Sequence, residues 1–96
     1  MSAITLDSKF FKHYKGLYYY VVGESIHTET DERFVNYISL YATYAFPYGQ
    51  MWSRPHDMFC GKIDDGRPRF VEVTKDKMPD DVLFDFEEYA SKRRMI

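Results

Sequence analysis

The sequence lacks the features of several familiar protein classes. Its single cysteine, Cys60, cannot form an internal disulfide, which excludes a disulfide-rich secreted scaffold. No apolar run approaches the ~20 residues that span a bilayer, and the N-terminus carries no basic-then-apolar leader. The glycines are scattered and none opens the predicted helix, which excludes a P-loop or a dinucleotide-binding fold. We therefore expect a cytoplasmic protein with no membrane segment.

Net charge is also small, at −2 with a sequence pI of about 5.9, which argues against bulk attraction to duplex DNA or anionic membranes. What the chain does have is aromatic side chains, which make up 19% of its 96 residues. These residues can build a substantial core in a small domain, so the composition indicates one folded domain and excludes a disordered chain.

Two segments predict a long antiparallel hairpin. Residues 17–22 are aromatic and β-branched and lie between Gly16 and Gly23, as is typical of a strand. Residues 33–41 read as the returning strand because their apolar side chains alternate. One face of this strand would carry Phe34, Asn36, Ile38 and Leu40, and the other Val35, Tyr37, Ser39 and Tyr41.

The remaining chain predicts short strands and one helix. Strands are expected at 51–53, 60–63 and 69–74, with a helical turn at 55–59 and an aromatic loop at 42–50. Pro79 opens a helix whose first turn is acidic and whose last turn is basic. Short strands joined by tight turns favour a small antiparallel β-barrel with one C-terminal α-helix. The expected divisions are a lead-in (1–9), the barrel (10–76) and the helix (77–96).

A series of short strings resembles one family. In order they are His13-Tyr14-Lys15-Gly16, Tyr19, His27-Thr28-Glu29-Thr30, Val35-x-Tyr37 with Tyr41, Trp52-x-Arg54-Pro55, Phe59 and Arg69-Phe70. Over residues 11–70 this series resembles the bacterial family called domain of unknown function 1653. The resemblance implies a small bacterial or phage protein with an SH3-like barrel, and it brings no activity with it. The loop at 42–50 is unusually aromatic for the family, and the C-terminal helix lies outside its pattern.

Catalytic and metal-binding interpretations are weak. His56 lies four residues before Cys60, but no third group is placed to orient such a pair, so a buried, inert cysteine is the preferred interpretation. His13, His27, His56 and Cys60 lack the closely spaced pairs of structural zinc sites. We therefore expect a protein that is not an enzyme and that needs no metal or cofactor.

The preferred candidate site is aromatic with one guanidinium. Tyr19 and Tyr37 lie on facing strands, and Trp52 and Arg54 share one side of a third strand. An aromatic wall beside an arginine suits a small planar or anionic ligand, such as a nucleotide. His27 and Glu29 would orient polar groups of that ligand, although they also fit a simple polar hairpin tip. The structural alternative is that Arg54 stacks on an aromatic ring or pairs with a carboxylate and ties the barrel closed.

Two other binding roles stay open. A protein-interaction domain could use the loop at 44–48 and the apolar stripe of the helix, which includes Phe86. Single-stranded nucleic acid is a further alternative, because Lys9, Lys12, His13 and Lys15 alternate with Phe10, Phe11 and Tyr14. The sequence is compatible with a monomer or with a small homo-oligomer associating through the helix.

Overall fold

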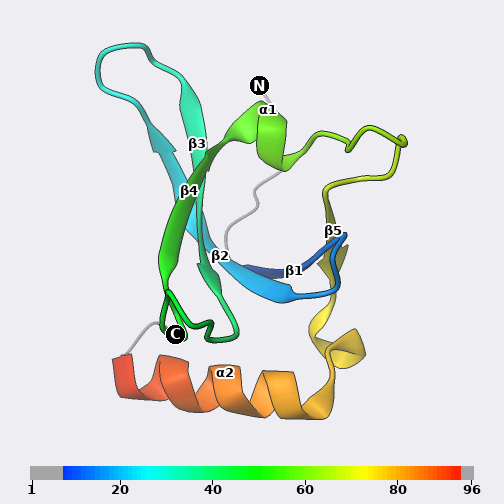
Figure 1. Cartoon of the computed structure of the whole chain (residues 1–96). Coiled ribbons are helices and arrows are strands. Elements are labelled where there is room, and N and C mark those ends of the chain that lie inside the picture. Colours follow the sequence, from blue (N-terminus) through cyan, green and yellow to red (C-terminus); the bar gives the residue numbers. More distant parts are fainter. Residues whose placement is uncertain (1–7, 94–96) are drawn as a thin grey trace.

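The computed structural model describes residues 8–93 of the chain. Within this range five strands form one antiparallel sheet in the order β4-β3-β2-β1-β5 (Figure 1). The elements are β1 (Lys9–His13), β2 (Tyr18–Ile26), β3 (Arg33–Ser39), β4 (Met51–Pro55), α1 (His56–Phe59), β5 (Phe70–Val73), the 3₁₀ turn η1 (Lys75–Lys77) and α2 (Asp80–Arg93).

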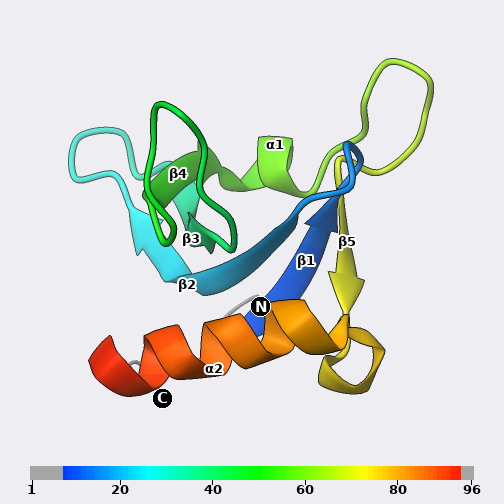
Figure 2. The same cartoon turned by 60° about the horizontal axis from the view of Figure 1, so that its bottom comes forward.

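The sheet separates two apolar cores. Figure 2 shows α2 on one side of the sheet, and α1 with the loops at 40–50 and 60–69 on the other. Because side chains alternate along a strand, neighbouring residues enter different cores. Phe10, Tyr20 and Ile38 face α2, while Phe11, Val21 and Tyr37 face α1.

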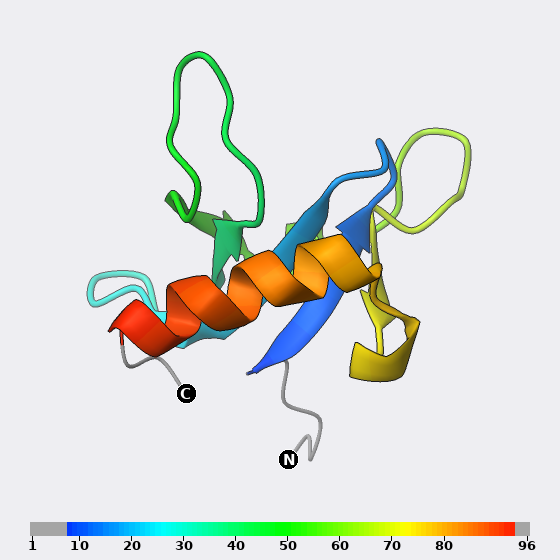
Figure 3. The same cartoon turned by 90° about the horizontal axis from the view of Figure 1, so that it is seen from below.

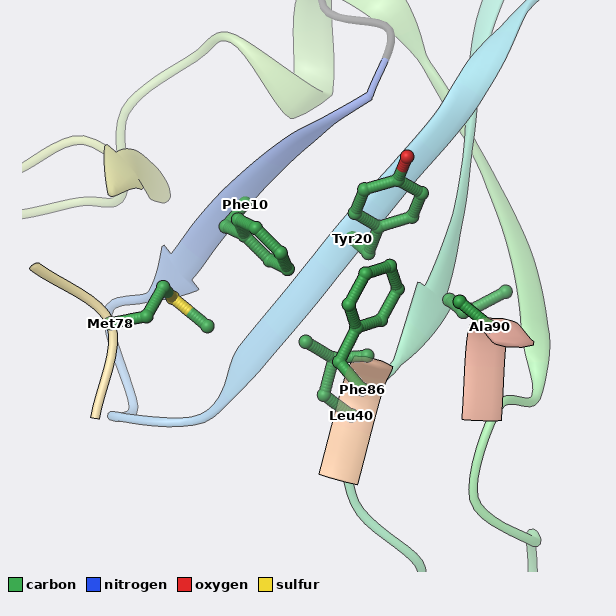
Figure 4. Close-up of a cluster of buried hydrophobic side chains, with 7 residues drawn as sticks. Phe10, Tyr20, Leu40, Met78, Phe86 and Ala90 are labelled. Carbon is green, nitrogen blue, oxygen red and sulfur yellow. The ribbon is translucent and has the colours of Figure 1, made fainter. Parts of the chain in front are cut away.

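The core under α2 is built from aromatic contacts. Helix α2 runs across the sheet (Figure 3), and its Phe86 lies 5.0 Å from Phe10 and 4.5 Å from Tyr20 between ring centroids. Figure 4 shows these rings together with Leu40, Met78 and Ala90. The helix begins after Pro79 with acidic residues in its first turn and basic residues in its last, as predicted.

The predicted mostly β, antiparallel architecture with one C-terminal helix is confirmed. Closure of the sheet into a barrel is not observed within residues 8–93, where β4 and β5 are the two outer strands. The chain between them forms α1 and a loop, and Phe59 from α1 packs against Phe11, Tyr37 and Phe70 in one of the two cores. Pro55 ends β4 and precedes α1, because proline lacks the donor that another ladder position needs.

Three local predictions differ from the structure. The strand expected at 60–63 is absent from the described chain, which shows there only an isolated bridge between Lys62 and Pro68. Strand β1 was not predicted, and it lies between β2 and β5. Cys60, expected to be buried, is exposed because it caps the end of α1 at the surface. Most of the predicted lead-in, residues 1–7, and Arg94 of the expected basic helix end lie outside the described residues.

Candidate functional site

Strand register brings four of the six predicted site residues to one place. Tyr37 on β3 pairs with Trp52 on β4, and Arg54 lies two residues further along β4 on the same face. Tyr19 on β2 belongs to the same face, and its ring meets the Tyr37 ring edge to face at 5.4 Å. These four residues line a hollow of about 200 Å³ on the α1 side of the sheet, together with Tyr41.

Tyr41 is the member of the hollow that the site prediction omitted. Its hydroxyl is hydrogen-bonded to that of Tyr19, and the two rings meet edge to face at 5.5 Å. The alternation of residues 33–41 already placed Tyr41 on the face of Tyr37, so the same pattern could have found it.

Burial favours the neutral form of the Tyr19 phenol. It raises the pKa of Tyr19 above its ordinary value, and the Tyr41 hydrogen bond acts in the same direction. The charge of Arg54 opposes the increase but is outweighed. Tyr19 is therefore a neutral hydroxyl at physiological pH, able to donate or accept a hydrogen bond.

Arg54 is held in place by neutral partners. Its Nε donates to the Tyr37 hydroxyl at 3.2 Å, and its guanidinium carbon lies 5.9 Å from the centre of the Phe70 ring. Within residues 8–93 no carboxylate lies within ion-pairing distance of it. The structural alternative is thus partly realised through Tyr37, but the terminal nitrogens of the guanidinium make no hydrogen bond to a described residue.

Trp52 forms the outer wall of the hollow. It is half-buried on β4, and its ring is packed edge to face against Phe46 at 4.8 Å. Phe46 comes from the loop between β3 and β4, so the aromatic loop noted in the sequence supports one side of the hollow.

His27 and Glu29 do not join this group. They lie at the tip of the β2–β3 hairpin, which extends away from α2 (Figure 1). The Nδ1 atom of His27 accepts a hydrogen bond from the Glu29 backbone N–H at 3.1 Å, and Thr28 donates to the Glu29 carboxylate. His27 lies six positions beyond Val21, the β2 partner of Tyr37, and six steps of extended chain span ~20 Å, which is why the tip cannot reach the hollow.

The His56–Cys60 pair shows no sign of activation. Sγ of Cys60 lies 3.7 Å from Nε2 of His56. Although the residue is exposed, partial desolvation of its thiol, followed by the nearby carboxylates of Glu24 and Asp57, raises the pKa of the thiol. A nucleophilic cysteine needs the opposite shift, to a lower pKa.

Within the described chain, no three His, Cys, Asp or Glu side chains gather as metal ligands would. No described helix has the length and apolar character to cross a bilayer.

Comparisons with known proteins agree on one family. The sequence profile described as "Protein of unknown function (DUF1653)" matches residues 9–72. A crystal structure of a protein from Bordetella bronchiseptica belonging to DUF1653 is similar, with 35% sequence identity and a TM-score of 0.58. The match covers 69% of this chain and 85% of that one. No curated protein matches the chain.

Proposed function

This chain belongs to the DUF1653 family of proteins of unknown function, and from that premise we propose that it is a non-enzymatic module that binds a small, planar, anionic ligand resembling a nucleotide. The observation that carries the proposal is the hollow lined by Tyr19, Tyr37, Tyr41, Trp52 and Arg54.

The chemistry of the hollow suits one planar aromatic group and one negative charge. Aromatic walls favour stacking or edge contact with a planar group, and the free end of Arg54 can donate two parallel hydrogen bonds to an anion. A hollow of about 200 Å³ is smaller than the roughly 300–1,000 Å³ typical of drug-sized ligands. It therefore fits one planar group of about the size of a nucleobase. The ligand would be met in a reducing compartment such as the cytoplasm, by a monomer or a small homo-oligomer.

The test is a thermal-shift screen of nucleosides, nucleotides and aromatic carboxylates. A ligand at a hundred times its Kd stabilises a fold by about 2.7 kcal/mol, which corresponds to roughly 10 °C or more in Tm for a domain of this size. Arg54→Ala removes charge-assisted hydrogen bonds worth about 1.5–3 kcal/mol, so it should reduce the shift to less than about half.

Arg67→Ala is the matched control, because Arg67 is exposed and paired with Asp65 at 2.8 Å. It should keep the full ligand-induced shift. Failure of every compound to raise the wild-type Tm, or an undiminished shift in Arg54→Ala, would refute the proposal.

A protein-interaction role is the second candidate, supported by one observation. Tyr44 and Phe46 in the loop between β3 and β4 are exposed, Tyr44 fully. The helix stripe gives no such support, because Phe86 and Ala90 are buried against the sheet. Binding of single-stranded nucleic acid by the basic and aromatic residues 9–15 is also less well supported. Phe10 and Phe11 are buried, and among the Phe and Tyr side chains of this segment Tyr14 alone is exposed.

A further inference from the structure

Beside the aromatic hollow lies a cluster of cationic side chains that the site prediction did not include. Strand β1 pairs with β5 so that His13 faces Phe70, and the two rings meet edge to face at 4.9 Å. Arg54 contacts the same Phe70 ring, and His13 lies 6.1 Å from Tyr19 between ring centroids. The imidazole of His13 therefore lies against Phe70 and near Tyr19, next to the aromatic hollow, and it lines a neighbouring hollow with Tyr14 and Arg67.

Arg69 adds a second guanidinium. It precedes Phe70, and its charge acts on His13 together with the charges of Arg54 and Lys15. The Nε of Arg69 is buried and has no hydrogen-bond partner among the described residues. A buried donor without an acceptor is costly, and no described acceptor offsets the charge of Arg69 at this atom.

The electrostatics of this cluster are one-sided. Burial and then Arg54, Lys15 and Arg69 lower the pKa of His13, and no carboxylate is among the groups that affect it. The described ion pairs of Lys and Arg engage Arg67, Lys9, Arg33 and Lys75, and none engages Arg54 or Arg69. Of these paired cations, Arg67 lines a surface hollow together with His13. Unpaired cations beside a pocket favour an anion, and an anion bound here would relieve their mutual repulsion.

The hydrogen bonding of His13 sets which of its ring nitrogens can donate. Its Nδ1 accepts from the backbone N–H of Lys15 at 3.2 Å. The neutral ring therefore carries its proton on Nε2, which is left to donate. His13 and Arg54 thus lie at the same Phe70 ring with donors that no described acceptor engages, and Arg69 is next to Phe70 in the chain.

We infer that His13, Arg54 and Arg69 form a phosphate subsite next to the aromatic hollow, so that the ligand is a nucleoside 5′-monophosphate whose base lies against Trp52 and the tyrosines. This inference rests on the proposed function and deepens it. The small volume of the hollow agrees with it, because the hollow has room for the base, and the phosphate lies outside it on the His13 side.

The experiment compares matched probes that differ by one phosphate. Adenosine, guanosine, cytidine and uridine are titrated against their 5′-monophosphates, and inorganic phosphate is titrated alone. Trp52 fluorescence reports the hollow, and the side-chain ¹⁵N resonances of His13 report the subsite. At least one monophosphate should bind about ten- to a hundredfold more tightly than its nucleoside, as expected for charge-assisted hydrogen bonds.

Arg69→Gln and His13→Gln should each reduce the preference for the monophosphate about tenfold and leave the affinity for the nucleoside unchanged. Arg33→Gln is the control, because the Arg33 guanidinium is already paired with the Glu24 carboxylate at 2.6 Å, and it should keep the preference. An unchanged Tm in each variant ensures that the loss is not unfolding.

The outcomes separate the two proposals. Equal affinity for nucleoside and monophosphate, or a preference that survives in Arg69→Gln and His13→Gln, overturns the subsite and leaves the proposed function standing. If no nucleoside or monophosphate binds but inorganic phosphate shifts the His13 resonances in wild type and not in Arg69→Gln, the subsite stands and the proposed function fails. If none of the probes binds, both the phosphate subsite and the proposed function are wrong.

Discussion

Tyr48 shows at the residue scale how one buried hydroxyl ties stability to pH. Its hydroxyl oxygen is buried without a hydrogen-bond partner among the described residues, next to Tyr89 of α2. Burial, followed by the negative charge of Asp85, raises the pKa of Tyr48 from 10.0 to about 12. The folded protein therefore keeps this proton to higher pH than the unfolded chain does, and folding is favoured while the proton is present.

Alkaline pH should reveal this coupling. The contribution of Tyr48 is complete below pH 10.0 and is lost as pH rises through about 12. The free energy of unfolding should therefore fall over this range, and Tyr48→Phe should fall less steeply. Part of the decrease with pH should remain in Tyr48→Phe, because the pKa of Tyr19 is raised in the same direction. Denaturant titrations between pH 8 and 12 measure the effect.

The fully exposed Tyr44 provides the control, since Tyr44→Phe should keep the wild-type slope. At pH 8 Tyr48→Phe should be at least as stable as wild type, because it removes an unsatisfied hydroxyl. A Tyr48→Phe variant with the full alkaline slope would contradict the assignment.

Helix α2 is the element whose amphipathicity most directly explains its position. Its buried residues, Phe86 and Ala90, are four apart and lie on one face, while Phe84 is on the opposite face and is 65% exposed. Two phenylalanines of the same helix therefore have opposite environments. The helix is held by the packing of Phe86 against Phe10 and Tyr20, and this contact buries the apolar face of the helix against the sheet.

Truncation of these two residues should give very different results. Phe86→Ala should lower the free energy of unfolding by about 3–5 kcal/mol, because it opens a cavity among buried rings. Phe84→Ala should change it by no more than about 0.5 kcal/mol. Urea denaturation followed by far-UV circular dichroism measures both, and similar losses would mean that α2 does not pack as described.

The whole molecule is organised around strands that serve two cores at once. Successive residues of β1, β2 and β3 point to opposite faces, so each of these strands contributes to the core under α2 and to the core under α1. Damage to one core must then disturb the strands that build the other. This arrangement favours a single cooperative unit even though no barrel closure joins the two outer strands within residues 8–93.

Unfolding should consequently be two-state. Trp52 is the single tryptophan and reports the α1 side, while circular dichroism at 222 nm is dominated by α2 on the other side. Their denaturation curves should coincide, and Phe86→Ala should move both midpoints by the same amount. Loss of the helical signal before the fluorescence signal would show that the cores are independent.

Local pattern was sufficient for several features of this protein. Alternation in residues 33–41 correctly divided Val35 and Tyr37 from Ile38 and Leu40, because side chains on a strand change face at every residue. The same rule grouped Trp52 with Arg54, and the end charges placed α2. These inferences involve residues close in the chain, where backbone geometry alone sets which side chains share a face.

Long-range pairing decided the rest. Strand β1 has no clean alternation, since Phe10 and Phe11 are adjacent and enter different cores, so only its neighbours β2 and β5 identify it as a strand. That pairing also brings His13 to Phe70 and beside Arg54, across most of the chain. Whether the sheet closes, and which cations border the aromatic hollow, depends on contacts between distant segments, and these carry no local periodicity that a sequence could display.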